Sequence, residues 1–357
     1  MSRSLAISLA SSGHRTERLS VRYVPYNLLG EEPNIIADGP ANAYTKLVLS
    51  HWPGVKLPEP LRDDLSCQIA FKYLEQPEYH IDVDAVSNNH FDEDGLVSLY
   101  ALISPQEAMA DKQLLIDVAA AGDFGIYTDR DAARIAFVLK AWATPPLSPL
   151  NQSVFALPYP EQVEILYSEL LPRLPKILER VHYLEQYWRQ EDTLLDRSEE
   201  AIGEGTIKIE EIPQADLAIV TLPTPKPSLA EEAYSKPWSE TIQLMAVHNQ
   251  TDMMRILLVQ GQRYRLYYRY ETWVQYVSRQ LQPRKDFSSL AETLNQVEKR
   301  EQSKQSEHRK IQWVFDDVQA LNPALRIESD QPSAIRDEVF KETVVSYLVS
   351  EANQFGS

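Results

Sequence analysis

The sequence predicts an α/β protein with two lobes, and three observations support this fold class. Short apolar and β-branched runs alternate with helical patterns over residues 20–150, which is typical of an α/β lobe with a largely parallel sheet. A long helical section follows over residues 151–204 and is expected to connect the lobes. After Gly205 the pattern changes to closely spaced strands, which predicts a smaller α+β lobe over residues 205–357.

Composition limits the class of function. The chain has 357 residues, enough for two domains with their own cores, and a net charge of −17. This charge disfavours binding to an extended nucleic-acid duplex or to an anionic membrane. No apolar run approaches the length of a membrane span, and the short apolar run after Met1 is a poor secretion signal, so we expect a cytoplasmic protein. The single cysteine, Cys67, excludes an intramolecular disulfide.

Two strand-to-turn units open the first lobe. Residues 21–26 predict a short edge strand, and residues 34–38 predict a second strand that ends at Asp38. A helix is expected over residues 41–49, with His51 in the segment that closes it. Asp38 and His51 then flank one helix, and either can face a binding edge of the sheet. The alternative is a turn aspartate and a helix-terminal histidine, which interacts favourably with the helix dipole.

The next loop carries the densest cluster of titratable side chains. Residues 79–87 predict a strand and residues 95–103 predict a helix, so the loop lies where α/β proteins bind ligands. It holds one imidazole and three carboxylates within five residues: His90, Asp92, Glu93 and Asp94. Such a density of negative charge requires a cation or good solvation. A solvated helix start, with carboxylates capping free N–H groups, is the alternative.

This loop also carries a family resemblance. The run from His90 through Asp92 and Asp94 to Gly95 resembles the first motif of the DHH phosphoesterase superfamily, in which the matching histidine and aspartates bind a pair of Mn²⁺ ions. The Asp-His-His triplet that names the family is absent from this chain, and the resemblance covers the loop alone. It implies that His90, Asp92 and Asp94 are metal ligands of a divergent, metal-dependent phosphoesterase.

A two-metal site needs more ligands than one loop supplies. The helix start at Ser104 predicts a helix ending at Gly122, with Asp117 on its polar face and Asp123 just beyond it. Glycines near Asp123 permit close approach of the backbone. We expect the remaining ligands to come from Asp38, His51, Asp117 and Asp123. The expected catalytic carboxylates are Asp92, Asp94 and Asp123, with Mn²⁺ or Mg²⁺ as cofactor, because mixed oxygen and nitrogen ligands suit these ions.

The remaining elements follow from periodicity and turn residues. A helix is expected from Thr128 to Trp142, and helical periodicity then resumes at Pro160 and continues to about Ile202. Strands are expected over residues 206–212, 217–222, 241–248, 253–260 and 263–270, with Gly261 and Gln262 as a two-residue hairpin turn. Two helices (271–281 and 287–310), a strand (311–318) and a closing helix (334–350) complete the second lobe.

The second lobe contains a basic segment, residues 253–285, in which Glu271 is the single acid. Arg263, Arg265 and Arg269 fall on one face of the expected strand because side chains alternate. Guanidinium groups suit phosphate, and the interleaved tyrosines can stack a base or sugar. We therefore expect Arg263, Arg265, Arg269 and His248 to bind substrate. The alternative is a solvent-facing side of the strand, on which the arginines balance the negative charge of the rest of the chain.

Together these features predict a hydrolase that cleaves a phosphodiester or phosphoanhydride in a nucleotide-like substrate, with a metal-activated water as nucleophile. The expected partner is a phosphate-containing small molecule or a short oligonucleotide. A cyclic dinucleotide, a nucleoside phosphate and polyphosphate all remain open, as does the oligomeric state. A second hypothesis, favoured by the missing triplet, is a non-catalytic DHH-like module that binds a nucleotide or a protein. A third is an interaction scaffold built on the helical section.

Overall fold

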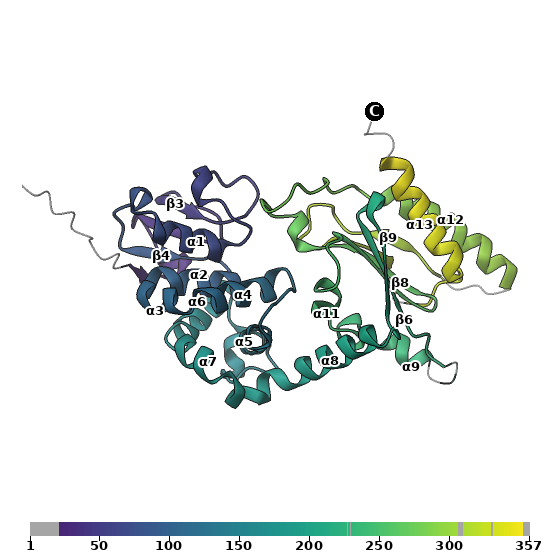
Figure 1. Ribbon diagram of the computed structural model, residues 1–357, viewed down its shortest axis with the longest axis horizontal. Helices are drawn as coiled ribbons and strands as arrows, with labels where there is room; N and C mark the ends of the chain where they lie inside the picture. Colours follow the sequence, from purple (N-terminus) through teal and green to yellow (C-terminus); the bar gives the residue numbers. More distant parts are fainter. Residues whose placement is uncertain (1–20, 227, 229, 306–309, 330, 353–357) are drawn as a thin grey trace, which may run out of the picture.

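The computed structural model describes residues 21–226, 228, 230–305, 310–329 and 331–352. The apolar run after Met1, which contributed to the expected localisation, lies outside these residues. Two lobes lie beside each other and are joined along one side by the long helix α8, Glu185–Gly203 (Figure 1). Within the described part of the chain, no helix has the length and apolar character needed to cross a membrane.

The first lobe contains a four-stranded sheet in the order β1-β4-β2-β3. All its pairings are parallel, which confirms the predicted sheet type. The strands are β1 (Arg22–Tyr23), β2 (Asn34–Ala37), β3 (Thr45–Leu49) and β4 (Ala85–Ser87). Both central strands, β2 and β4, are buried throughout. Because the strands are parallel, the loops after β2, β3 and β4 all leave from the same edge of the sheet.

Helices bury the sheet of this lobe and form its core. They are α1 (Ser66–Glu75), α2 (Glu93–Ile103), α3 (Pro105–Ala110), α4 (Lys112–Asp123) and α5 (Arg130–Ala143). The apolar run that follows the acidic loop is α2, whose residues 94–102 are all buried. The helix predicted from Ser104 to Gly122 is instead two helices, because the backbone leaves helical geometry at Asp111, with φ −105° and ψ 17°.

Two predictions for the first lobe are wrong. Residues 41–49 were expected to be a helix, but residues 45–49 form β3, which pairs in parallel with β2 through Ile35 and Leu47. Backbone pairing with a buried neighbour outweighs the weak helical pattern of this stretch. The strand expected over residues 79–87 is shorter than predicted, since only Ala85–Ser87 pairs and Pro77–Tyr79 forms a 3-10 turn.

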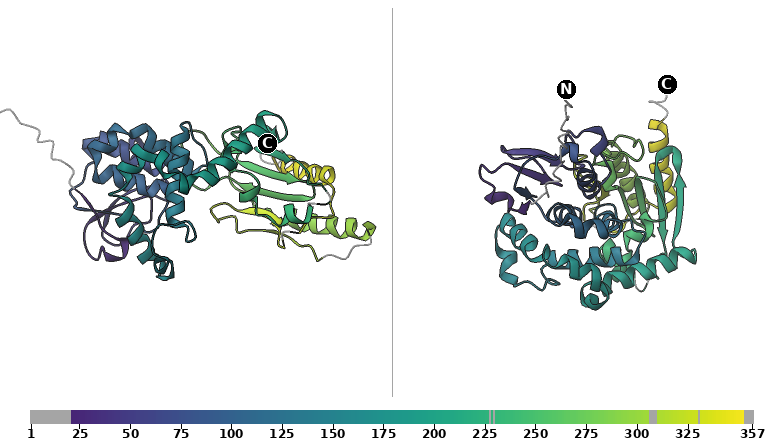
Figure 2. Two further views of the ribbon diagram at one scale, coloured as in Figure 1. Left: turned by 90° about the horizontal axis from the view of Figure 1, so that it is seen from below. Right: turned by 60° about the vertical axis from the view of Figure 1, so that its left-hand side comes forward.

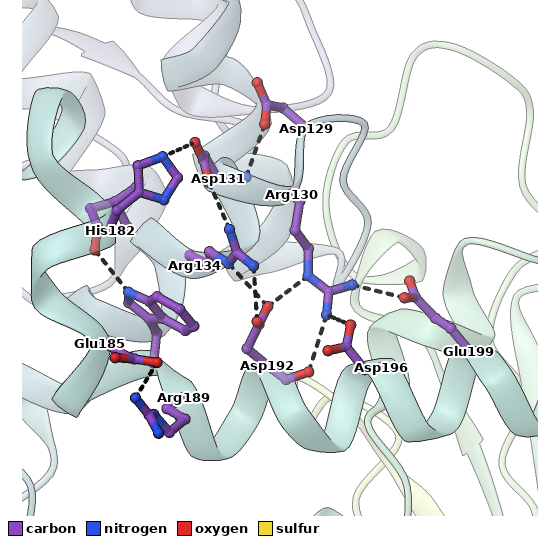
Figure 3. Close-up of polar contacts among 12 residues, drawn as sticks. Asp129, Arg130, Asp131, Arg134, His182, Glu185, Arg189, Asp192, Asp196 and Glu199 are labelled. Carbon is purple, nitrogen blue, oxygen red and sulfur yellow. Dashed lines mark hydrogen bonds and ion pairs between the residues drawn. The ribbon is translucent and has the colours of Figure 1, made fainter.

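The predicted connector is helical. It comprises α6 (Tyr159–Leu170), α7 (Leu174–Arg180) and α8, with 3-10 turns at Gln152–Ala156 and Val181–Leu184. A network of ion pairs fixes α8 to α5 (Figure 3). Asp192 on α8 lies between two guanidinium groups, 2.6 Å from Arg130 Nε and 3.1 Å from Arg134 Nη2. These charge-assisted contacts hold the connector against the first lobe.

The second lobe is built on a six-stranded sheet in the order β5-β6-β7-β8-β10-β9. Its pairings are antiparallel except for the parallel pair β6 and β7, so the sheet is mainly antiparallel as predicted. The strands are β5 (Lys208–Ile212), β6 (Leu217–Leu222), β7 (Arg255–Gln260), β8 (Arg263–Tyr268), β9 (Trp313–Phe315) and β10 (Ala324–Ile327), the last of which was not predicted. Gly261, with φ +57°, makes the predicted turn between β7 and β8.

Helices lie on both faces of this sheet. One face packs against α12 (Ser288–Gln305) and α13 (Asp337–Ala352), both visible on the outer side of the lobe (Figures 1 and 2). The other face packs against Trp238 of the short helix α10 (Trp238–Thr241), Val247 of α11 (Leu244–His248), and Ile242 between the two helices. The small helix α9 (Ala230–Ser235) precedes them.

Two predictions for the second lobe are wrong. The stretch 241–248 was expected to be a strand, but most of it forms α11. This helix packs Leu244 and Val247 with the sheet and Met245 and Ala246 with the core of the first lobe. Residues 271–281 were expected to be a helix, but only a 3-10 turn, Tyr270–Thr272, is present there. The chain beyond that turn hydrogen-bonds to the first lobe, and these contacts replace the helical bonds.

Candidate metal centre

Titratable residues follow the parallel strands at the edge where those strands end. Asp38 comes directly after β2, and His51 lies two residues after β3. The loop after β4 supplies His90 and Asp92, the first turn of α2 supplies Asp94, and Asp123 is the last residue of α4. Six residues from four separate segments of the chain therefore meet at one place, because three parallel strands and one helix end there.

Asp38 lies at the centre of the cluster, and its two carboxylate oxygens face different histidines. Its Oδ1 is 3.5 Å from His51 Nε2, and its Oδ2 is 3.3 Å from His90 Nε2. Asp38 has a positive φ of 50° and is 1% exposed. Two groups with metal-ligand spacing share this residue: Asp38, His51 and Asp94 form one, and Asp38, His90 and Asp92 form the other.

The two groups differ in their exposure to solvent. The side chains of His51 and Asp94 are fully buried, and Asp123 Oδ2 lies 3.5 Å from His51 Nε2 on this buried side. By contrast, the side chains of His90 and Asp92 are 21% and 31% exposed. We call these the buried position and the open position. The cluster is therefore more open to solvent on the side of His90 and Asp92.

Local structure explains how the carboxylates are held. The N-terminus of α1 contacts Asp94, whose Oδ2 and Oδ1 accept hydrogen bonds from Ser66 N at 2.8 Å and Cys67 N at 2.7 Å. The Ser66 hydroxyl donates to Asp38 Oδ1 at 2.8 Å. Free N–H groups at a helix start stabilise a negative charge. The hydroxyl and N–H groups of α1 therefore fix two of the carboxylates in orientation.

The start of α2 orients the open position. Asp92 caps this helix by accepting a hydrogen bond from Gly95 N at 2.8 Å, which leaves its Oδ2 facing His90 Nε2 at 2.7 Å. A Cβ atom at Gly95 would lie 2.7 Å from the Tyr167 hydroxyl and 2.9 Å from Asp92 Oδ1. The loop can turn this tightly only because residue 95 lacks a side chain.

Hydrogen bonding also selects the tautomer of His51. Its Nδ1 lies 2.5 Å from the backbone carbonyl oxygen of Asp64, so Nδ1 carries the proton and donates it. Its Nε2 is then the nitrogen that faces the carboxylates of Asp38 and Asp123. A histidine whose other nitrogen is bonded to a carbonyl in this way is a typical metal ligand.

Electrostatics show that the negative charge of the cluster is not balanced by its own residues. Burial raises the pKa of Asp94 well above its usual value, and the charges of Asp38 and Asp92 raise it further. Burial also raises the pKa of Asp123, together with the charges of Asp94 and Asp92. Two histidines face four carboxylates, so a bound cation would relieve this repulsion.

The pKa values of Asp38 and His90 shift in the opposite sense. Burial alone would raise the pKa of Asp38, but His90, then His51 and the Ser66 hydroxyl, lower it to about 2. Burial alone would lower the pKa of His90, but Asp92 and Asp38 raise it to about 11. Without a metal, His90 therefore provides the positive charge next to Asp38.

The spacing and the donor set fit a metal ion. Among the described residues, Asp38 Oδ2 and His51 Nε2 are buried without a hydrogen-bond partner. Adjacent ligands of an octahedral ion at 2.0–2.1 Å lie about 3 Å apart, and the histidine nitrogens here are separated from the carboxylate oxygens by 2.7–3.9 Å. Small movements of the side chains would bring them into coordination. The chain thus contains a buried Asp-His-Asp group able to bind a metal ion.

Most residues of the predicted metal site meet in this cluster, and one does not. His90, Asp92, Asp94, Asp38, His51 and Asp123 are all present. Asp117 lies elsewhere, since its carboxylate accepts hydrogen bonds from Thr128 N at 2.9 Å and Asp129 N at 2.6 Å. Asp117 therefore fixes the turn that leads into α5 and does not belong to the metal cluster.

The residues expected to bind substrate have other partners. Arg269 pairs with Glu271 and donates to the carbonyl oxygen of Thr251. Arg263 lies 4.2 Å over the ring of Trp238, and Arg265 shares a small hollow with it and with Arg326. These contacts lie in the second lobe, and none of them involves a residue of the metal cluster.

His248 lies where the two lobes meet. Its Nδ1 is 2.8 Å from the carbonyl oxygen of Phe124, next to Asp123, and its Nε2 is 2.9 Å from the Tyr267 hydroxyl. Burial and the charge of Arg269 lower its pKa to about 3, so this histidine is neutral. It joins the lobes at a point one residue from the metal cluster.

Sequence reasoning missed the residues of the second lobe that border the cluster. The ring of Tyr270 packs edge-on against His51 at 5.9 Å, and Trp273 packs against Trp52 at 5.3 Å. Gln275 donates to the backbone oxygens of Trp52 and Val55. The aromatic residues of the basic segment were noted, but the expected helix over residues 271–281 concealed their position.

Comparison with known proteins places the chain in a family without adding an activity. No curated protein and no solved structure matches it. One family, described as "Family of unknown function (DUF6687)", matches residues 19–356, nearly the whole chain. On this extent of match, the chain belongs to the DUF6687 family.

Proposed function

We propose that this protein is a metal-dependent phosphoesterase that hydrolyses a phosphodiester or phosphoanhydride in a nucleotide-like substrate. The observation that carries the proposal is the position of Asp38, whose two oxygens face His51 on one side and His90 on the other. A carboxylate shared by two ligand groups is the arrangement of a two-metal site. Such sites are common in phosphatases and nucleases.

The donor set favours Mn²⁺ or Mg²⁺ as the cofactor. The cluster offers carboxylate oxygens and imidazole nitrogens, and its single nearby thiol, that of Cys67, is buried with a raised pKa caused by burial. When bound, two such ions lower the pKa of a coordinated water and neutralise charge on the phosphoryl oxygens. His90, Asp92 and Asp38 would hold one ion, and Asp38, His51, Asp94 and Asp123 would hold the other.

The chain's own residues would orient the ligands, admit substrate and supply a hydrogen bond. Ser66 and the α1 N–H groups keep Asp38 and Asp94 in place. Substrate would approach from the exposed side of His90 and Asp92. Burial and the charges of Asp123 and Asp38 raise the pKa of Tyr270, so its hydroxyl keeps its proton beside the cluster and can donate to a phosphoryl oxygen.

A second candidate is a non-catalytic module that binds a nucleotide or a protein. It is favoured because arginines that were expected to hold phosphate already have partners within the chain. Arg269 is paired with Glu271, and Arg263 stacks on Trp238. A phosphoesterase would then have to bind phosphate mainly through its metals. The substrate proposed for the enzyme is a phosphate-containing small molecule or short oligonucleotide in the cytoplasm.

The test is metal content paired with activity. The purified full chain, loaded with Mn²⁺ and analysed for metal, is expected to retain two equivalents and to hydrolyse bis-p-nitrophenyl phosphate. Asp92→Asn should remove the activity. Asp192→Asn is the matched control, because this buried aspartate lies in the α5–α8 network and should leave metal content and turnover intact. Two bound ions with turnover would support the enzyme, whereas one bound ion or none, without turnover in any phosphoester screen, would favour the binding module.

A further inference from the structure

A segment of the second lobe lies against the loop that carries His51. We call residues 270–278 the interlobe strap; they leave the end of β8 and reach across to the first lobe (Figure 1). Gln275 N donates to the backbone oxygen of His51 at 2.7 Å. The Gln275 side-chain amide donates to the oxygens of Trp52 at 2.6 Å and Val55 at 2.9 Å. One residue therefore fixes the backbone on both sides of Trp52.

The strap also contacts the residue that orients the His51 ring. Asp64 accepts hydrogen bonds from Val277 N at 2.6 Å and Ser278 N at 3.0 Å, and a third from the Ser278 hydroxyl. The backbone oxygen of this same Asp64 accepts the Nδ1 proton of His51. Asp64 is 7% exposed, so its carboxylate depends on these strap donors for solvation.

The ring of His51 is thus supported from three directions by the strap or by a residue bonded to it. Gln275 holds its backbone, Asp64 holds Nδ1, and the ring of Tyr270 packs against its face at 5.9 Å. Its Nε2 is left directed at Asp38 and Asp123. The open position has a different support, since His90 and Asp92 are held by the start of α2 and by Asn89.

We infer that the interlobe strap positions His51 as a ligand, so that the buried metal position forms fully only when the two lobes are docked. Gln275 and Asp64 are the positioning residues. The inference rests on the proposed two-metal site and adds to it a coupling between lobe docking and occupancy of one metal position. Because such coupling is reciprocal, metal at the buried position must also stabilise the docked strap.

The experiment is a Mn²⁺ titration of the full-length protein. Electron paramagnetic resonance measures the free Mn²⁺ at each step, and the binding curve is fitted to two sites. Gln275→Glu keeps the size of the side chain but cannot donate to the Trp52 and Val55 oxygens. Asp64→Ala removes the three strap contacts but keeps the backbone oxygen that bonds His51. Gln280→Ala, at an exposed position just after the strap, is the control. Circular dichroism checks that each variant is folded.

We expect Gln275→Glu and Asp64→Ala to lower the Mn²⁺ affinity of one position by about 10–100-fold, the usual effect of losing a partner that orients a ligand. The other position and the Gln280→Ala variant should be unchanged. Unchanged affinity at both positions, or an equal loss at both, would overturn the inference while leaving the proposed function standing. No Mn²⁺ binding by the wild type would overturn the proposed function and the inference with it.

Amide hydrogen exchange tests the reciprocal effect without relying on a variant that might fail to fold. Saturating Mn²⁺ should slow exchange at the backbone amides of Gln275, Val277 and Ser278 in the wild-type chain, since each donates to the first lobe. Asp94→Asn, which removes a ligand of the buried position alone, should abolish this slowing. Equal exchange rates with and without Mn²⁺ in the wild type would contradict the coupling.

Discussion

The metal cluster and the α5–α8 network both gather carboxylates, but they neutralise them differently. In the network, Asp192 contacts Arg130 and Arg134, and Arg130 also contacts Asp196 at 2.5 Å and Glu199 at 2.8 Å. In the cluster, four carboxylates face two imidazoles and one another. Figure 3 shows how fully the first group is paired.

This difference separates a structural charge cluster from a binding one. A buried carboxylate is stable when a guanidinium satisfies it, and it is costly when its neighbours are also carboxylates. In the network the buried carboxylate, that of Asp192, contacts two guanidinium groups. The other carboxylates, those of Asp131, Asp196 and Glu199, each contact one guanidinium group and are partly exposed to water, so the network needs no further ion. The cluster contains Asp94 and Asp123, whose pKa values are raised by burial and by other carboxylates, and it is completed only by added positive charge.

The largest expected effect follows from removing the shared ligand. Asp38→Asn keeps the shape of the side chain but removes the charge that both groups use. We therefore expect the Mn²⁺ affinity of both metal positions to fall by more than about 100-fold, which exceeds the effect of losing a partner that only orients a ligand. Metal analysis of the purified variant measures this. Asp94→Asn is the comparison, because it should weaken the buried position and leave the open one. Retention of two ions by Asp38→Asn would show that the groups do not share this residue.

A second effect is the dependence of metal affinity on pH, which we expect of the metal cluster. In the metal-free protein, the pKa of His90 is raised to about 11, so His90 holds a proton that a metal must displace, and the raised pKa values of Asp94 and Asp123 act in the same direction. Metal affinity should therefore rise with pH, by more than about tenfold from pH 6 to pH 7 if more than one proton leaves. Calorimetry of Mn²⁺ binding in buffers of different ionisation enthalpy measures the proton release. Affinity independent of pH would contradict the assignment of these residues as ligands.

The smallest effect concerns the network itself. Asp192→Asn removes one charge from a partly exposed group of ion pairs, so we expect the free energy of unfolding to fall by about 1–3 kcal/mol. Urea denaturation of the metal-free protein measures this, and Mn²⁺ stoichiometry should be unchanged. A parallel loss of metal from this variant would mean that the two regions are not independent.

Local sequence predicted the open position better than the buried one. His90 and Asp92 of the open position lie close together in sequence before the predicted helix, so their spacing alone indicated a site; of the buried position, the same pattern included only Asp94. Asp123 was recognised through its flanking glycines. Asp38 and His51 were only candidates, because their meeting depends on the strand order β4-β2-β3, which no local pattern shows.

The parts that could not be predicted depend on contacts between distant segments. Residues 45–49 become a strand by pairing with β2, although the sequence predicted a helix over residues 41–49. The strap loses its expected helix because Gln275, Val277 and Ser278 bond to the first lobe. In both cases a backbone partner more than ten residues away decides the structure, and propensity measures only the local preference.

The backbone of Asp38 restricts which sequences can retain the site. With φ at +50°, this position is in the left-handed region, which among ordinary residues favours glycine, asparagine and aspartate. Glutamate retains a carboxylate but fits this backbone poorly, and glycine and asparagine fit the backbone but supply no pair of charged oxygens. Aspartate alone meets both demands, so we expect every substitution at this position either to strain the backbone or to remove a charged oxygen.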